Sequence, residues 1–210
     1  MASRTDGVKT KALIMAGGKA TRMKGEIEKP LIDLDGIRLI GHVIESTSKV
    51  KDMKDIFVAI SKNTPKTKRF LSEHYPHVNL IETSGAGYHQ DMVEAIIYRK
   101  LYFPILVISS DMPLMESSYM DKVIGIFSKE KCDSLSVFIR AEKQTLHGSH
   151  SFDLEGEMVV PAGINIINGI SIGSEEIPQY NLIEDYDPHF ININTEGDLD
   201  LARAFLSSRK

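Results

Sequence analysis

The stretch KALIMAGGKATRMKGEIEKP, residues 11–30, constrains the fold of this chain more than any other. The apolar run Ala12–Ala16 predicts a buried strand, and Gly17 and Gly18 follow it directly. Glycine lets the backbone come close to a ligand and point its N–H groups at it. The chain carries a formal net charge of -4, yet four cations follow the glycines within eleven residues: Lys19, Arg22, Lys24 and Lys29. The stretch therefore predicts a strand followed by a loop that binds a polyphosphate.

The glycine spacing excludes two common phosphate-binding loops. Neither the Walker pattern G-x-x-x-x-G-K-[ST] nor the dinucleotide fingerprint G-x-G-x-x-G occurs in this stretch. The alternative is an ordinary strand-to-helix turn with a solvated basic face. Arg22 and the following Glu28-Lys29-Pro30-Leu31 favour the phosphate site over that alternative.

Length and composition indicate a single globular unit. We expect residues 1–10 to be a polar tail and residues 11–210 to form one domain, with 42% apolar and 26% charged residues. The tail lacks the apolar core of a signal peptide, and no apolar run has the length of a membrane span, so we expect a cytoplasmic protein. The single Cys132 excludes an intramolecular disulfide. The net negative charge argues against binding to nucleic acid.

Apolar runs alternate with helical patterns along the first 140 residues. This alternation predicts βαβ units and an α/β fold with a mostly parallel central sheet. The expected strands are Ala12–Ala16, Ile56–Ser61, Val78–Glu82, Ile105–Ser109 and Leu135–Arg140. The expected helices are Ile40–Lys49, Pro65–His74, Gln90–Lys100 and Tyr119–Lys129.

The pattern changes after residue 140. We expect a loop or irregular hairpin over Ala141–Gly156 and two short strands, Glu157–Val160 and Gly163–Ile167, around a proline. The segment Gly169–Asp187 reads as loop, with one helical turn near Ser174–Ile177.

Two helices carry start signals. Thr64 precedes Pro65 and is the expected N-cap of the helix that begins there. Thr195 is the expected cap of a last helix, Glu196–Leu206, with Asp198 completing a capping-box pair.

The polar loops of the expected sheet converge on one edge. In a doubly wound sheet, ligands bind at the carboxyl ends of the strands. The loops Gly17–Lys29, Lys62–Thr64, Thr83–Tyr88 and Ser110–Met112 all follow such ends. Asp111, in the last of them, suits either a Mg²⁺ ligand or the N-cap of the next helix, and its position alone does not decide between them.

The motifs AGGKATRM and EKPL resemble the nucleotidyltransferase signature G-G-x-[GAS]-x-R-M followed by [EPD]-K-P-L. This superfamily includes sugar-1-phosphate nucleotidylyltransferases and molybdenum-cofactor guanylyltransferases. More narrowly, the chain resembles the archaeal GTP:adenosylcobinamide-phosphate guanylyltransferases. The matching segments run in order along nearly the whole chain: Ser61–Lys68, Thr83–Tyr88, Ser109–Asp111, Val160–Asn165 and Phe190–Thr195.

The resemblance implies a three-layer, Rossmann-like nucleotidyltransferase fold and a reaction. That reaction transfers GMP from GTP to a corrinoid phosphate, adenosylcobinamide phosphate, and releases pyrophosphate. The resemblance assigns Arg22 to the β- and γ-phosphates, Lys29 to the α-phosphate and the acceptor, and Asp111 to the metal. It places the GTP at Ala16, Gly17, Gly18, Lys19, Ala20, Thr21, Thr83, Ser84, Gly85, Gly87 and Ser110, and the acceptor at Gly163 and Asn165.

The chain departs from the superfamily pattern at three positions. Ser110 stands where glycine is common, and Asn192 and Asn194 stand where many members place a second metal carboxylate. Asn192 can still offer a neutral oxygen, so we expect Mg²⁺ to bind weakly and to enter with GTP. The alternative is that the two amides only satisfy backbone groups at a strand end.

Three other interpretations stay open. The chain suits a molybdenum-cofactor or sugar-phosphate nucleotidyltransferase as well, or a GTP-binding regulatory module that has lost catalysis, as its two asparagines allow. No Ser/His/Asp or Cys/His constellation occurs, which agrees with an acceptor phosphate that is ionised at neutral pH and needs no general base. A homodimer is one assembly that the sequence permits.

Overall fold

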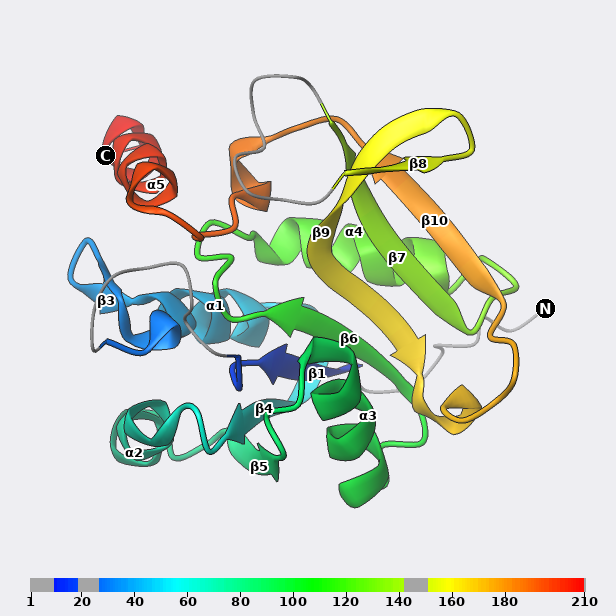
Figure 1. Cartoon of the computed structure of the whole chain (residues 1–210), viewed down its shortest axis with the longest axis horizontal. Coiled ribbons are helices and arrows are strands. Elements are labelled where there is room, and N and C mark those ends of the chain that lie inside the picture. Colours follow the sequence, from blue (N-terminus) through cyan, green and yellow to red (C-terminus); the bar gives the residue numbers. More distant parts are fainter. Residues whose placement is uncertain (1–9, 19–26, 142–150, 210) are drawn as a thin grey trace.

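The computed structural model describes residues 10–18, 27–141 and 151–209. Its centre is an eight-stranded sheet in the order β10-β7-β9-β6-β1-β4-β5, with β8 paired to β9 (Figure 1). A separate two-stranded sheet joins β2 and β3. The strands are β1 (Thr10–Met15), β2 (Asp33–Leu34), β3 (Ile37–Arg38), β4 (Met53–Ser61), β5 (Asn79–Thr83), β6 (Pro104–Ser109), β7 (Ser134–Arg140), β8 (Phe152–Leu154), β9 (Glu157–Asn168) and β10 (Gln179–Glu184).

Helices cover both faces of the large sheet. The helices are α1 (Leu39–Ser48), α2 (Pro65–His74), α3 (Tyr88–Tyr98), α4 (Ser117–Phe127) and α5 (Glu196–Ser208), with 3-10 turns η1 (Lys29–Leu31), η2 (Gly169–Ser171) and η3 (Pro188–Phe190). Ile14 of β1 belongs to the core shared with α1, α2 and α4, whereas its neighbour Leu13 belongs to the core shared with α3. Successive side chains of a strand point to opposite faces, so the molecule has three layers. The expected α/β fold is confirmed.

The sheet is mostly parallel, and its connections diverge at β1. This strand pairs in parallel with β4 on one side and with β6 on the other. From β1 the chain continues to β4 and β5 on one side and then crosses to β6 on the other side. β1 therefore lies at the switch point, where the connections on its two sides run in opposite directions. Such a point leaves a crevice at the carboxyl ends of the strands. Only β9 runs antiparallel between two of the parallel strands, β6 and β7.

The region around Pro161 differs from the expectation of two short strands. One continuous strand, β9, runs through it. Opposite it, β7 advances only from Ser136 to Phe138 while β9 advances from Asn165 to Pro161, a register shift within the ladder. A bulge of this kind accommodates a proline, which has no N–H to donate to the ladder.

The segment 169–187 also differs from the expectation. Its helical turn is η2, not one near Ser174–Ile177, and residues 179–184 form β10, an edge strand parallel to β7. Tyr180 and Leu182 lie two residues apart and both pack against the main core, which is the alternation of a half-buried strand. The hairpin expected within Ala141–Gly156 is confirmed for the part described, where β8 turns into β9.

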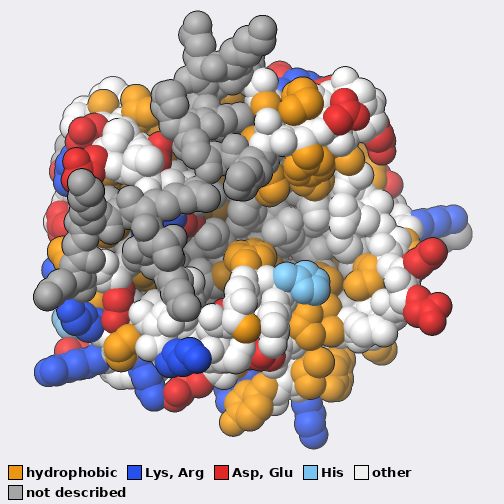
Figure 2. Space-filling model, in the orientation of Figure 1, with side chains coloured by type: hydrophobic (Ala, Val, Ile, Leu, Met, Phe, Trp, Pro, Cys, Tyr) orange, Lys and Arg blue, Asp and Glu red, His pale blue; other side chains and the backbone are white. Residues whose placement is uncertain are grey.

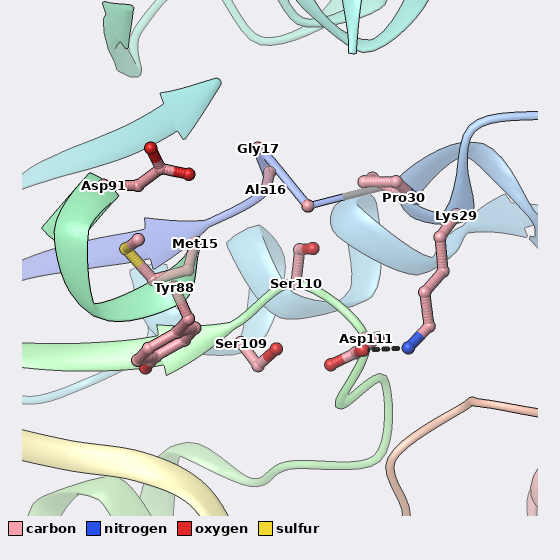
Figure 3. A pocket seen from close by; sticks show the side chains of 11 residues that line it. Met15, Ala16, Gly17, Lys29, Pro30, Tyr88, Asp91, Ser109, Ser110 and Asp111 are labelled. Atoms are coloured by element: carbon pink, nitrogen blue, oxygen red, sulfur yellow. Dashed lines mark hydrogen bonds and ion pairs between the residues drawn. The ribbon is translucent and has the colours of Figure 1, made fainter. Parts of the chain in front are cut away.

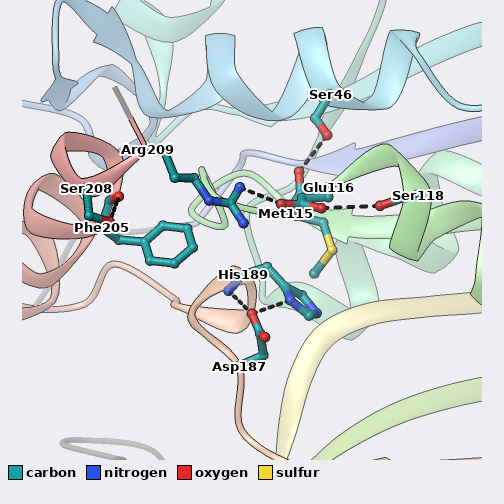
Figure 4. Close-up of polar contacts among 9 residues, drawn as sticks. All are labelled: Ser46, Met115, Glu116, Ser118, Asp187, His189, Phe205, Ser208 and Arg209. Carbon is teal, nitrogen blue, oxygen red and sulfur yellow. Dashed lines mark hydrogen bonds and ion pairs between the residues drawn. The ribbon is translucent and has the colours of Figure 1, made fainter.

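The last helix, α5, lies beside the small β2–β3 hairpin and not against the large sheet (Figure 1). Its predicted capping box is present, since the side chains of Thr195 and Asp198 each accept from the other residue's backbone N–H. At its far end Arg209 forms a 2.5 Å ion pair with Glu116, which holds the pKa of that carboxyl below its usual range (Figure 4). Both ends of α5, the helix that follows Asn192 and Asn194, are thereby tied down.

The outer surface mixes both signs of charge. Figure 2 shows basic and acidic side chains interspersed around the edge of one face, over the part of the chain that the structure describes. No described helix is long and apolar enough to cross a membrane.

Candidate active site

A pocket opens at the carboxyl ends of β1 and β6, the crevice that the topology predicts (Figure 3). Its wall comes from four parts of the chain: the end of β1, the turn η1, the start of α3 and the end of β6. The lining residues are Met15, Ala16, Gly17, Gly18, Lys29, Pro30, Tyr88, Asp91, Ser109, Ser110 and Asp111. The structure thus brings six predicted site residues into one wall: Ala16, Gly17, Gly18, Lys29, Ser110 and Asp111.

A cluster of four polar side chains lies at one end of this pocket. Lys29 Nζ forms an ion pair with the carboxylate of Asp111 (Figure 3). It also donates to Asn194 Oδ1 at 2.8 Å. The side chains of Lys29 and Asp111 are only 19% and 12% exposed. The amide of Asn192 lies 2.5 and 3.1 Å from the two oxygens of Asp111, and its nitrogen faces them because two acceptors would repel. One positive and one negative charge therefore balance inside a partly buried network.

Asp111 does not cap the helix that follows it. The next helix, α4, begins at Ser117 with Glu116 in the capping position. The backbone carbonyl of Asp111 instead accepts from Ile193 N at 2.9 Å, which joins the end of β6 to the strand-like segment between the two asparagines. Of the two roles left open for Asp111, the helix cap is wrong. The interpretation of Asn192 and Asn194 as amides for backbone groups alone is also wrong, since both contact the charged pair.

Gly163 lets β9 come close to this cluster. Its φ is +83°, and a Cβ at this position would lie 2.9 Å from Met112 Sδ and 3.0 Å from the side-chain amide of Asn192. A side chain would push away the amide that contacts Asp111. The backbone conformation is one that glycine adopts freely and other residues rarely do.

Tyr88 closes the pocket on the side of α3. Its hydroxyl lies near the side chain of Asn165, so this predicted acceptor-side residue is close to the pocket wall. Tyr88 as a residue is 44% exposed, but its hydroxyl end faces the pocket, where desolvation raises its pKa above the ordinary value of 10 and the negative charge of Asp111 raises it further. The hydroxyl is therefore neutral near pH 7 and able to donate and accept hydrogen bonds.

The loop Thr83–Tyr88 is held in its conformation by the buried carboxylate of Asp91. Asp91, 3% exposed, accepts from Gly85 N at 2.8 Å and from Ala86 N at 3.3 Å. Ser84 donates its N–H and its hydroxyl to Glu94, both at 2.8 Å, and these bonds lower the pKa of Glu94. Thr83 donates its hydroxyl to a β4 carbonyl at 3.0 Å. The hydroxyls of both loop residues thus maintain the loop's own conformation.

The connection between β4 and α2 contacts both the loop at Gly17 and the loop at Gly85. Ser61 Oγ donates to Gly17 O at 2.7 Å, and Asn63 Nδ2 lies 3.5 Å from Gly17 O and 3.4 Å from Gly85 O. A Cβ on Gly85 would stand 2.5 Å from the Asn63 amide, whereas one on Gly18 would meet nothing within 4 Å in the part of the chain that the structure describes. The expected convergence of these loops is confirmed for the described residues. Lys19, Ala20, Thr21 and Arg22 lie outside them.

Several side chains at the site were not among the predicted site residues. Tyr88 and Asp91 line the wall, and Asn194 binds the lysine. Asp91 had a recognisable signal, since an acidic residue in the first turn of a helix after a glycine loop has backbone N–H groups within reach. The signal for Asn194 was weaker, because its only distinction was that an asparagine stands where many superfamily members have a carboxylate.

The donors at this site fit a divalent cation only in part. No group of three or more His, Cys, Asp and Glu side chains that suits a metal occurs among the described residues. Asp111 supplies one carboxylate, and Asn192 has to turn its amide to supply an oxygen. Mg²⁺ prefers six oxygens in octahedral geometry. Most of these oxygens would have to come from a ligand.

The fold and the site define the class of protein. Residues 12–152 match the family of MobA-like NTP transferase domains, and the chain belongs to this family. Within it, the chain is 39% identical over 203 residues to adenosylcobinamide-phosphate guanylyltransferase of Methanocaldococcus jannaschii, covering 93% of this chain and 96% of that one. The family resemblance seen in the motifs is thereby confirmed.

More distant relatives share parts of the chain or its fold. The bifunctional protein GlmU of Campylobacter lari is 26% identical over 116 residues, which cover 55% of this chain and 27% of that protein. The structure of CMP:2-keto-3-deoxy-manno-octonic acid synthetase complexed with CTP superposes with a TM-score of 0.70 at 13% identity, covering 96% of this chain and 100% of that one. A 4-diphosphocytidyl-2C-methyl-D-erythritol synthase from Anaerococcus prevotii gives 0.67 at 13% identity, covering 94% and 96%. These two structural likenesses show the fold alone.

The bonds of Asp91 lead to a prediction about stability. Asp91→Ala removes the buried acceptor of the part-buried N–H groups of Gly85 and Ala86, so we expect the free energy of unfolding to fall by about 1–3 kcal/mol. Urea unfolding followed by circular dichroism measures the change. Glu94→Ala is the matched control on the same helix, since exposed Ser84 regains its bonds from water; equal losses in the two variants would contradict the role of Asp91.

Proposed function

We propose that this protein transfers GMP from GTP to adenosylcobinamide phosphate, giving adenosylcobinamide-GDP and pyrophosphate. The observation that carries the proposal is the Lys29–Asp111–Asn194 cluster beside Gly17 and Gly18. It puts a positively charged donor and two side-chain-free backbone positions at the switch point of a MobA-like NTP transferase fold. The acceptor and the guanine base rest on the similarity to the guanylyltransferase of M. jannaschii.

The reaction needs positioning and charge more than proton transfer. An oxygen of the acceptor phosphate attacks the α-phosphorus of GTP, the bond to the bridging oxygen of the β-phosphate breaks, and pyrophosphate leaves with the electron pair. Phosphate monoesters have a second pKa of about 6, so the attacking oxygen is already ionised at neutral pH. Lys29 supplies positive charge where negative charge develops, and that preorganised stabilisation is the largest contribution expected of such a site.

The pocket divides naturally into two sides in this proposal. Gly17 and Gly18 let the phosphates approach the end of β1, and the loop held by Asp91 lies beside them for the nucleoside. Tyr88 and Asn165 stand toward β9, where the resemblance places the acceptor. Asp111, with Asn192, would hold a Mg²⁺ that enters with GTP and adds further charge neutralisation. A cytoplasmic location and a homodimer stay predictions.

The test of the function compares acceptors. Pyrophosphate release is followed with GTP, Mg²⁺ and, in turn, adenosylcobinamide phosphate, a molybdopterin acceptor and a sugar 1-phosphate. We expect release only with the first. Release with one of the others would replace the proposed acceptor. Tight GTP binding without release in any mixture would favour a regulatory module instead.

Replacing Lys29 should damage turnover more than binding. Lys29→Ala removes a charge that acts on the transition state, so we expect kcat to fall on the order of 10²-fold or more while KM for GTP changes little. Arg22→Ala is expected to behave alike by the resemblance. Lys122→Ala, which removes a surface ion pair with Glu184, is the control for loss of a lysine. A kcat within a few-fold of wild type would remove Lys29 from the mechanism.

Gly18 offers a clean test of the phosphate loop. A Cβ here meets no atom of the described residues within 4 Å, so Gly18→Val should fold normally yet block the approach of the phosphates. We expect GTP binding, measured by titration calorimetry, to be lost. Gly125→Val, at an equally open position of α4, controls for the added side chain. Unchanged GTP affinity in folded Gly18→Val would refute the loop assignment.

The metal should depend on the nucleotide. With one carboxylate at the site, we expect weak Mg²⁺ binding to the protein alone and markedly tighter binding in the presence of GTP. Asn192→Asp adds a second carboxylate and should tighten metal binding. Titration calorimetry of Mg²⁺ into free and GTP-loaded protein measures both effects. Equal affinity in the two states, or full activity with excess chelator, would show that the cations act without a metal.

A further inference from the structure

Glu28, the residue before Lys29, reaches across to a different element of the fold. Its carboxylate accepts from the backbone N–H of Lys66 at 2.7 Å and from Thr67 N and Thr67 Oγ1, both at 2.6 Å. These groups form the first turn of α2, 38 residues further along the chain. Unpaired N–H groups and the helix dipole make this end of a helix favourable for a carboxylate. Glu28 thus caps α2 through space.

This cap replaces the one expected from the sequence. Thr64 occupies the N-cap position but makes no side-chain bond to its helix. Its hydroxyl turns back to β4, accepting from Ser61 N at 3.1 Å and lying 3.3 Å from Ser61 O. The N-terminus of α2 is therefore left for a group from outside the helix. The carboxylate at this helix end is that of Glu28, the first residue of the EKPL motif.

The helix is a firm support for Glu28. Thr64 and Thr67 are 1% and 0% exposed, and Leu71, one turn further on, is 0% exposed in the main core. On the other side of Glu28, its carbonyl accepts from Leu31 N at 2.8 Å, and Pro30 is buried. The backbone of Lys29 is thus held between the capped helix and a proline-containing turn.

We propose that Glu28 is a positioning residue for Lys29. A lysine side chain has four flexible carbons, so the place of its ammonium group depends on how firmly its backbone is held. Glu28 holds that backbone to α2, while Asp111 and Asn194 receive the ammonium at the pocket. The inference rests on the proposed function, because it gives Glu28 an effect only through Lys29. A simple helix cap would affect stability alone.

The test is a double-mutant cycle on kcat with wild type, Glu28→Ala, Lys29→Ala and the double variant. We expect Glu28→Ala to lower kcat by about tenfold to a hundredfold, with less change in KM for GTP, since misplacing a group by ~1 Å costs up to about 10² in rate. In the Lys29→Ala background, the same change should lower kcat no further. Glu73→Ala, which removes the Arg69–Glu73 ion pair of α2, should leave kcat unchanged.

Two measurements keep the outcome clear of folding effects. Hydrogen exchange at the amides of Lys66 and Thr67 should accelerate in Glu28→Ala, and thermal unfolding should show that the variant is folded at the assay temperature. Where Glu28→Ala does not fold, Glu28→Gln takes its place: it keeps the size and one acceptor oxygen, and should show a smaller loss of kcat that also disappears without Lys29.

Each outcome supports or overturns the inference. Losses that add in the double variant, or an unchanged kcat in Glu28→Ala despite faster exchange, would make Glu28 a helix cap and nothing more. An unchanged kcat in Lys29→Ala would overturn the role of Lys29 in the proposed function first, and the positioning role with it. The two failures are therefore distinguishable.

Discussion

The ion pair between Lys29 and Asp111 sets the arrangement of the site. Both side chains are largely shielded from water, and a shielded charge is costly unless an opposite charge and hydrogen bonds compensate it. The pair forces the η1 turn and the end of β6 together, and Asn192 and Asn194 bring in the segment before α5. The amides satisfy the pair without adding charge. A carboxylate in either place would leave surplus negative charge beside the expected phosphates.

The sheet supplies the geometry that this network needs. Because β1 lies at the switch point, the loops after β1 and β6 face the same crevice. The antiparallel β9 enters beside β6, and its irregular register around Gly163 brings the backbone within contact of Met112 and Asn192. A regular strand with a side chain at this position would hold the amide away from Asp111. The bulge is therefore part of the site's construction.

The sequence foretold the parts of this structure that depend on local pattern. The strands of the large sheet and the helices up to residue 140 follow from regular βαβ alternation, and the capping box of α5 from adjacent residues, whereas the short β2–β3 hairpin was not predicted. β10 was missed because QYNLIE stands in loop-like surroundings and packs only at an edge. Glu28 was missed as a support because its partners Lys66 and Thr67 lie far along the chain. Asp91 binds N–H groups in the loop just before it, so its local signal was present but was not used. Thr64 looked like a cap until its hydroxyl was seen to bond to Ser61.

The protonation of the described residues agrees with a transfer that needs no general base. Asp111 is engaged by Lys29 and Asn192, so its oxygens are committed to the cluster. The raised pKa of Tyr88 keeps its hydroxyl neutral, which makes it a hydrogen-bond partner and a poor base near pH 7. An acceptor phosphate with a second pKa of about 6 loses its proton to solvent before it binds. The site then has to hold two anions in line and balance the charge that develops between them, and a fixed lysine is suited to that task.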